Sequence, residues 1–181
     1  YGHDVWGPAS TTPRRTFGAK HWAEPLAWHA AALATGRRAR VFCASMADVF
    51  EDHPQLPPER AKLWPLIERT PRLDWQLLTK RPENMRRFAP WPVWPGNVWA
   101  GISVENQAAA DTRIPHLLEV PARVRFLSCE PLLGPLDLRP YLDGLHWVII
   151  GGESGPRFRP MDLDWARAII QQTTAACLAV Y

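Results

Sequence analysis

Four short stretches of the sequence repeat one order of residue types that could form a binding site. Each runs from an aliphatic residue through a small and a variable residue to a charged one. The stretches are Leu78-Thr79-Lys80-Arg81, Ile102-Ser103-Val104-Glu105, Leu127-Ser128-Cys129-Glu130 and Ile150-Gly151-Gly152-Glu153. The steps between their first residues, from 78 to 102, 127 and 150, are 24, 25 and 23 positions. This length accommodates one strand, one helix and two loops, so the stretches are copies of a repeating unit.

The charged residues of these stretches suit the recognition of a polar ligand. Lys80 and Arg81 are cationic donors for a carboxylate or a phosphate. Glu105, Glu130 and Glu153 can accept hydrogen bonds from ammonium or hydroxyl groups, and carboxylate oxygens are also ligands for Mg²⁺ or Mn²⁺. A charged residue often follows a strand only because the chain has reached solvent. Four copies in phase favour a shared site instead.

Two further features of the expected strand ends indicate ligand contact. Gly151 and Gly152 permit positive φ and a close backbone approach, which predicts a turn whose N–H groups face a ligand. Another apolar stretch is followed by Ser45 and Asp48, and we expect Asp48, with Lys80 and Arg81, to contact the substrate. No histidine lies within a repeated stretch and no Walker loop occurs, so the sequence does not indicate triad or P-loop chemistry.

The segments that must position these residues alternate between strand-like and helix-like patterns. The expected strands are 40–44, 74–79, 98–103, 123–128 and 146–151, and the expected helices are 21–35, 58–69, 82–88, 107–118 and 163–177. This alternation is typical of a parallel α/β sheet, in which the carboxyl ends of the strands share one edge. Pro65 and Pro115 predict a kink or break in two helices, and Gly36 predicts the end of the first.

Composition indicates one globular domain spanning residues 1–181. The chain is 46% hydrophobic and 22% charged, which excludes a disordered or fibrous protein. Its net charge of +3 permits an anionic partner such as a nucleotide or nucleic acid. No apolar run of about 18 residues and no secretory signal occurs, which predicts a cytoplasmic protein without a membrane segment. The widely spaced Cys43, Cys129 and Cys177 predict reduced thiols and show no metal-ligand spacing.

Five ordered motifs carry a resemblance to a known family. The motifs are "RVFCASMADVFED", "DWQLLTKRPEN", "GISVENQ", "RFLSCEPLLGPLDL" and "WVIIGGESGPRFRPM". Together they resemble the phage gene-product thirty-seven/sixty-eight family, an uncharacterised family of phages and bacteria. The likeness extends over nearly the whole chain, from "DVWGP" to the last expected helix.

The resemblance implies a radical S-adenosylmethionine-like enzyme with a partial (β/α) barrel. About five βα units are expected here, as the second to sixth units of a six-unit barrel, in a chain truncated at both ends. The family's three cysteines, which would bind a [4Fe-4S] cluster, are expected upstream of Tyr1. By strand position, Ser103 or Glu105 would contact the ribose, and Glu130 and the turn 151–153 would hold the adenine and methionine parts. The residues of that turn are Gly151, Gly152 and Glu153.

Three functional hypotheses follow. The first, from the resemblance, is the barrel portion of a radical S-adenosylmethionine-like enzyme of unknown substrate, inactive as this fragment and associated with a three-Cys-motif partner protein. The second is a hydrolase or lyase that holds Mg²⁺ or Mn²⁺ on strand-end carboxylates. Those carboxylates would be Asp48, Glu105, Glu130 and Glu153. The third is a non-catalytic nucleic-acid-binding module using arginines and tryptophans, as in "RRFAPWPVWPGNVW", although that segment is expected mainly to cover the barrel as a loop.

Overall fold

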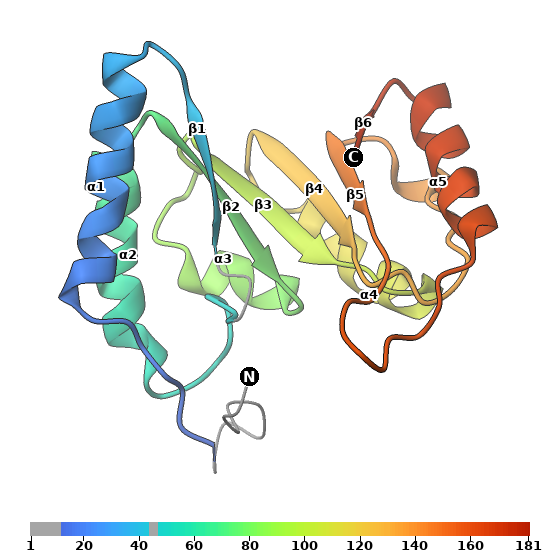
Figure 1. The fold of residues 1–181 in the computed structure, drawn as a ribbon, viewed down its shortest axis with the longest axis horizontal. Helices are drawn as coiled ribbons and strands as arrows, with labels where there is room; N and C mark the ends of the chain where they lie inside the picture. Colours follow the sequence, from blue (N-terminus) through green and yellow to red (C-terminus); the bar gives the residue numbers. More distant parts are fainter. Residues whose placement is uncertain (1–11, 44–46) are drawn as a thin grey trace.

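A curled sheet of six parallel strands forms the centre of the protein in a computed structural model that describes residues 12–43 and 47–181 (Figure 1). The strands follow one another across the sheet in chain order. They are β1 (Ala39–Cys43), β2 (Leu73–Thr79), β3 (Val98–Ser103), β4 (Val124–Cys129), β5 (Trp147–Ile150) and β6 (Ala179–Val180). The expected parallel α/β class and barrel-like curvature are therefore confirmed, and the sheet forms a half-barrel.

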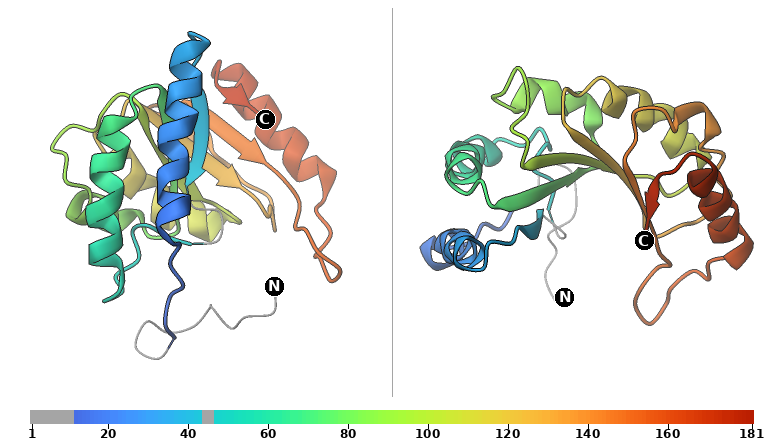
Figure 2. Two further views of the ribbon diagram at one scale, coloured as in Figure 1. Left: turned by 60° about the vertical axis from the view of Figure 1, so that its left-hand side comes forward. Right: turned by 90° about the horizontal axis from the view of Figure 1, so that it is seen from above.

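The helices lie on the outer side of the curled sheet (Figure 2). They are α1 (Ala19–Ala34), α2 (Leu56–Arg69), α3 (Met85–Phe88), α4 (Gln107–Leu118) and α5 (Leu163–Ala175), with 3-10 turns η1 (Pro82–Asn84) and η2 (Arg139–Tyr141). The side chain of Asn106 begins α4 by accepting a hydrogen bond from the Ala109 N–H at 3.0 Å. Gly36, with φ of 67°, follows the end of α1 as expected.

Two expectations about these elements were wrong. The sequence predicted five strands, whereas β6 adds a sixth beside β5. With only two residues, β6 is too short to show a strand period, and pairing with β5 defines it. A kink or a break was expected at Pro65 and Pro115, and the break does not occur, because α2 and α4 both continue past their prolines. Ala44, expected to end the first strand, lies outside the described residues.

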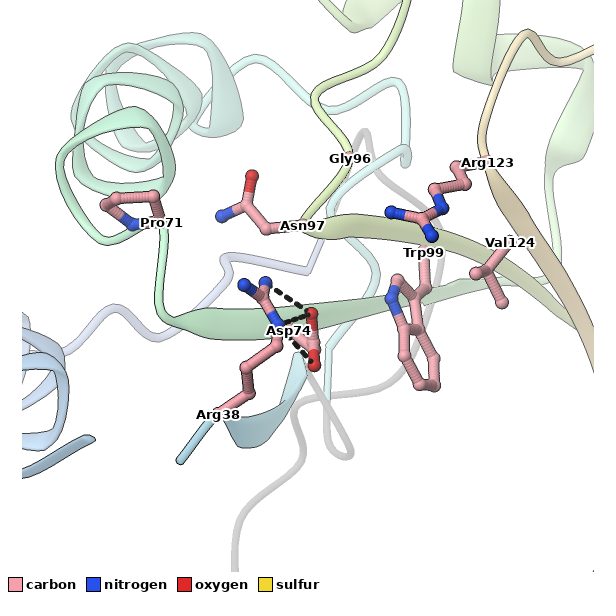
Figure 3. A pocket seen from close by; sticks show the side chains of 8 residues that line it. All are labelled: Arg38, Pro71, Asp74, Gly96, Asn97, Trp99, Arg123 and Val124. Atoms are coloured by element: carbon pink, nitrogen blue, oxygen red, sulfur yellow. Dashed lines mark hydrogen bonds and ion pairs between the residues drawn. The ribbon is translucent and has the colours of Figure 1, made fainter. Parts of the chain in front are cut away.

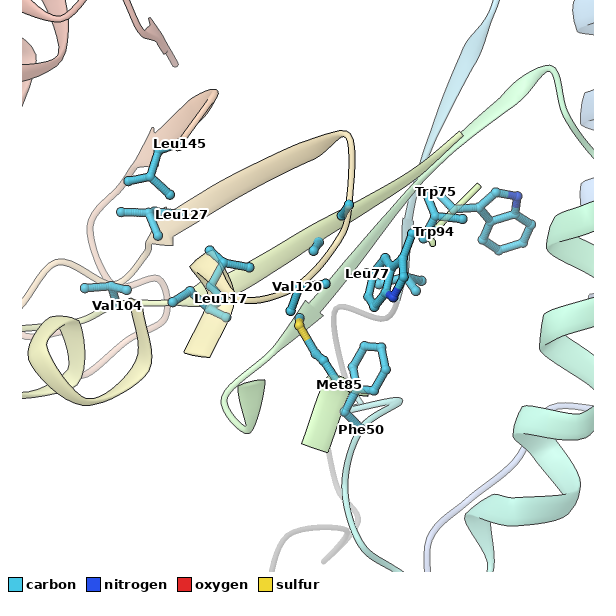
Figure 4. Close-up of a cluster of buried hydrophobic side chains, with 14 of the residues drawn as sticks. Phe50, Trp75, Leu77, Met85, Trp94, Val104, Leu117, Val120, Leu127 and Leu145 are labelled. Atoms are coloured by element: carbon cyan, nitrogen blue, oxygen red, sulfur yellow. The ribbon is translucent and has the colours of Figure 1, made fainter. Parts of the chain in front are cut away.

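Alternate residues of each strand build the hydrophobic core between the sheet and the helices. Register pairs Leu77 with Ala100, and Ile102 with Leu127, so these side chains share the outer face. All four are fully buried, and Leu117 of α4 packs in the same cluster (Figure 4). This core holds the strands in place and leaves their other face toward the concave side of the sheet.

The concave face is rich in aromatic side chains. Register aligns Gln76 with Trp99, and Phe126 with Trp147. The Phe126 and Trp147 ring centroids are 5.6 Å apart, and those of Trp99 and Trp147 are 6.0 Å apart. The Phe126 ring lies directly on Gly101, where an added Cβ would be only 2.0 Å from the ring Cζ atom. Gly101 therefore makes the space that Phe126 occupies.

The tryptophan-rich loop before β3 packs on the outside of the sheet. Trp94 is 4% exposed and stacks on Phe50, with ring centroids 6.1 Å apart. Trp91 makes edge contacts with both Trp64 and Trp94. As expected, this loop packs over the barrel through Trp91 and Trp94, whereas Trp99 at the end of the segment belongs to β3 and the concave face. Within the described ranges, no helix has the length and apolar character to cross a membrane.

Candidate functional site

The four repeated strand ends lie at one edge of the sheet. Ser103 pairs in register with Ser128, Thr79 pairs with Ile102, and Cys129 pairs with Ile150 just before Gly151. All the strands run in the same direction, so this is the carboxyl edge for each of them. The predicted shared edge is confirmed, and the charged residues that follow the strands lie along it. Ser45 lies outside the described residues.

Asp48 is the centre of a hydrogen-bond network at the ends of β1 and β2. Its carboxylate accepts from the Thr79 hydroxyl at 2.7 Å, the Phe50 N–H at 2.9 Å and the Lys80 N–H at 3.3 Å. Arg81 Nη1 adds an ion pair at 2.8 Å. The expected substrate-contact residues Asp48 and Arg81 are therefore bound to each other, which neutralises both groups.

Glu51 extends this network to a segment far away in sequence. Arg14 binds it through two hydrogen bonds of 2.8 Å, and Arg81 Nη2 adds a third at 3.2 Å. The Arg14 hydrogen bonds are the main cause of a lowered pKa of Glu51. Sequence reasoning missed Arg14 and Glu51, since neither belongs to a repeated stretch and their pairing spans 37 positions.

Glu105 lies in a second network at the end of β3. Lys80 Nζ donates to one of its oxygens, and Arg113 Nη1 donates to the other at 2.8 Å. Arg113 also donates to the Ser103 carbonyl oxygen at 2.8 Å, which fixes the guanidinium against the strand end. Burial acts to raise the pKa of Glu105, but Lys80 and Arg113 outweigh it, and the pKa is lowered. Arg113 comes from α4, and no repeated motif indicated it.

Together these groups form two ion-pair networks over β1 to β3, which the hydrogen bond from the Lys80 backbone N–H to Asp48 joins. They contain four cations and three carboxylates, and so carry a net charge of +1. The members are Arg14, Glu51, Arg81, Asp48, Lys80, Glu105 and Arg113. Because each carboxylate is held by at least one cation, this half of the edge is a preorganised framework, with few free acceptors for a ligand.

The turn after β5 is closed by its own ion pair. Arg159 donates to Glu153 from its backbone N–H, Nε and Nη2 at 2.6–2.8 Å. Hydrogen bonding from the Arg159 side chain lowers the pKa of Glu153 to about 2. The backbone has no positive φ at Gly151 or Gly152, and the positive value in this turn is at Gly155, 109°. The expected positive φ is therefore wrong for both glycines, whereas Gly152 does leave space beside the backbone, since the nearest described atom to an added Cβ would be Met161 Cβ at 3.8 Å.

Glu130, at the end of β4, differs from the other strand-end carboxylates. It is exposed and has neither an ion pair nor a side-chain hydrogen bond among the described residues. Its side chain lies over Gly151, where an added Cβ would be 2.9 Å from Glu130 Cδ. Gly151 therefore allows this carboxylate to lie beside the end of β5, where it is available to a ligand.

Gln76 is an unpaired donor on the concave face. The residue is 5% exposed, and its Nε2 has no hydrogen-bond partner in the described structure. Register places it between Phe42 of β1 and Trp99 of β3. A buried amide without a partner costs about 1–3 kcal/mol, so an acceptor atom from a ligand would stabilise it. Sequence reasoning missed Gln76, because nothing in the local pattern distinguishes it.

The cysteines do not suit an iron–sulfur cluster. Cys43 and Cys129 are in register with Leu77 and Ile150 of the outer face, opposite the concave side. Burial raises the thiol pKa of Cys129 to about 12, and that of Cys43 to the same value although the residue as a whole is half-buried. The described residues contain no group of three or more His, Cys, Asp or Glu placed to hold a metal ion.

Comparisons with known proteins give a family but no activity. No curated protein and no solved structure matches the chain. A family model described as "Protein of unknown function (DUF5131)" matches residues 2–181. Since this match covers nearly the whole sequence, the chain belongs to the DUF5131 family.

Proposed function

We propose that this chain is the barrel portion of a radical S-adenosylmethionine-like enzyme, and that its carboxyl edge binds S-adenosylmethionine. The curled sheet of parallel strands supports the proposal, because ligands of such sheets bind at the carboxyl ends of the strands. The observation that carries it is Glu130, a strand-end carboxylate that is exposed, unpaired among the described residues and positioned over Gly151.

Glu130 matches the polar groups of this cofactor. S-adenosylmethionine carries an ammonium group and ribose hydroxyls, and an ionised carboxylate accepts strong, charge-assisted hydrogen bonds from an ammonium. Glu105 and Glu153 were expected to share this role, but their cationic partners already occupy their oxygens. Ser103 is 4% exposed at the same edge, and Gly152 leaves room beside the backbone. We therefore assign the principal contact to Glu130, with Ser103, Gly151 and Gly152 beside it.

The concave face supplies a complementary surface for a ring system. The half-buried indoles of Trp99 and Trp147 lie on this face, beside the buried and unpaired Gln76 amide. These features support a nucleoside rather than a purely aliphatic ligand. When bound, S-adenosylmethionine supplies a sulfonium centre whose carbon–sulfur bond is cleaved on reduction. The three thiols of this chain do not fit a [4Fe-4S] cluster, so the proposal concerns cofactor binding alone.

Isothermal titration calorimetry with S-adenosylmethionine tests the proposal. We expect Glu130→Gln to weaken binding by about 1.5–3 kcal/mol, or roughly 10- to 150-fold, because the carboxylate charge is lost while its shape is kept. Glu83→Gln is the matched control, since Glu83 is also exposed and unpaired in the described structure but does not end a strand. Folded protein without measurable binding, or equal affinity in both variants, would contradict the proposal.

The divalent-metal alternative receives no comparable support. Of its four expected ligands, Asp48, Glu105 and Glu153 are each held by arginine or lysine. A parallel titration with Mn²⁺ separates the two hypotheses, because tight Mn²⁺ binding that Glu130→Gln abolishes would favour the metal enzyme. From the family resemblance we also propose a three-Cys-motif partner protein.

A further inference from the structure

Arginines gather at the amino edge of the sheet, opposite the candidate cofactor site. Within two residues of the first residue of any strand, the chain has six arginines and a single carboxylate, Asp74. Three of the arginines lie at β1, one at β2 and two at β4. They are Arg37, Arg38, Arg40, Arg72, Arg123 and Arg125. This edge therefore has an excess of positive charge larger than the +3 of the whole chain.

Half of these arginines have no internal partner. Arg38 binds Asp74 at 2.6 Å, and Arg125 donates to the carbonyl oxygens of two adjoining loops. The side chains of Arg37, Arg72 and Arg123 make no ion pair or hydrogen bond within the described ranges, and all three residues are exposed. These three guanidinium groups are therefore available to an anionic ligand.

A cavity of about 520 Å³ opens at this edge, and of the six arginines Arg38 and Arg123 line it. In Figure 3, Arg38 and Arg123 lie on either side of it, and the indole of Trp99 forms part of the wall between them. Arg40 extends the same surface on the concave side, where its guanidinium is 5.5 Å from the Trp99 ring centroid and 5.6 Å from that of Trp147. The site thus combines cationic groups with the faces of aromatic rings.

This combination identifies the chemical class of the ligand. Guanidinium groups bind phosphate oxygens, and indole rings stack with nucleobases. Three inter-strand spacings of about 4.8 Å, roughly 14 Å in total, separate the arginines of β1 from those of β4. This distance excludes a single phosphate group as the ligand of both sets of arginines. Each nucleotide of a nucleic-acid strand carries one phosphate, so a strand that spans roughly 14 Å brings more than one phosphate to these arginines.

We infer that the amino edge of the sheet binds single-stranded nucleic acid, with phosphates on Arg37, Arg72 and Arg123 and a base at Trp99. The inference does not rest on the proposed cofactor contact at Glu130, which lies at the opposite edge, although both proposals use the Trp99 indole on the concave face. Trp99 distinguishes this surface from a basic patch for anionic membranes, because an indole held within a sheet face cannot insert into a bilayer.

Fluorescence anisotropy with labelled single-stranded DNA and RNA of about 15 nucleotides tests this inference. The triple variant Arg37→Ala, Arg72→Ala, Arg123→Ala should bind at least about tenfold more weakly at roughly 50 mM salt. Three lost phosphate contacts should also reduce the slope of log affinity against log salt by about 2. Trp99→Leu should weaken binding by roughly five- to 150-fold, with a smaller effect on that slope.

A second triple variant provides the matched control. Arg86, Arg139 and Arg167 are exposed arginines away from the amino edge, and replacing all three by alanine changes the net charge equally. The control should bind within about twofold of the unaltered protein. Equal losses in both triple variants, no binding to either oligonucleotide, or binding only to phosphatidylserine vesicles would overturn the inference. Equal affinity for a mononucleotide would overturn the assignment to a strand, and thermal unfolding checks that each variant is folded.

Discussion

The contact between Gly101 and Phe126 gives the sharpest prediction about the concave face. An ideal Cβ on Gly101 would lie 2.0, 2.3 and 2.5 Å from three carbons of the Phe126 ring. Carbon atoms in favourable contact are about 3.5–4.0 Å apart, so Gly101→Ala would require a shift of roughly 1.5 Å. The ring is fully buried between neighbouring strands and cannot move this far without disturbing β3 or β4.

The expected cost follows from these distances. Overpacking of this kind costs about 1–3 kcal/mol, and the overlap places Gly101→Ala at the upper end. Alanine also restricts the unfolded chain more than glycine does, which offsets about 0.4–1 kcal/mol of this loss in stability. We therefore expect a net loss of about 2 kcal/mol, which corresponds to a Tm lower by about 4–8 °C for a domain of this size. Urea unfolding followed by circular dichroism measures the free energy directly.

A double-mutant cycle tests the reason for this loss. Phe126→Ala alone should cost about 3–5 kcal/mol through the cavity that it leaves. With the Phe126 ring removed, Gly101→Ala no longer causes an overlap. The double variant should therefore be about 1–2 kcal/mol more stable than the summed losses of the two single variants predict. Gly134→Ala is the control, since its nearest atom would be 3.9 Å away, and it should not destabilise the protein. Additive losses, or a Gly101→Ala protein as stable as the parent, would refute the reasoning.

Three further predictions concern the strand-end loops and their charges. Glu105→Gln should cost about 1–3 kcal/mol at neutral pH. Folding lowers the pKa of Glu105, so its contribution to the free energy of unfolding is complete above the unfolded pKa of about 4.3 and is lost as the pH falls through the folded pKa. The difference in stability between the parent and Glu105→Gln, measured by urea unfolding, should therefore shrink below about pH 4. Asn106→Ala removes the N-cap of α4 and should lower the Tm by about 2–4 °C, which Asn106→Asp should largely restore. Gly151→Ala should weaken S-adenosylmethionine binding in calorimetry by displacing Glu130 while the fold persists, whereas Gly134→Ala should bind normally; equal affinities of the two variants would contradict the role assigned to Gly151.

Local patterns in the sequence were sufficient to predict most of the architecture. Runs of apolar residues predicted β1 to β5, and the in-phase strand ends predicted that Thr79, Ser103, Ser128 and Gly151 share one edge. These features depend on residues close together in the chain, since the side-chain period and the length of a βα unit are local properties. β6 was missed because two residues carry no period, and only its pairing with Trp147 and Val148 defines it.

Tertiary structure alone decided which strand-end groups are free. The sequence showed four similar charged ends, but it could not show that Arg14 binds Glu51 across 37 positions or that Arg113 of α4 binds Glu105. These pairings leave Glu130 without a cation in the described structure, although no local feature distinguishes it from its neighbours. The physical reason is that a carboxylate's partner depends on which side chains the folded chain brings within a few ångströms, and distances along the sequence do not determine this.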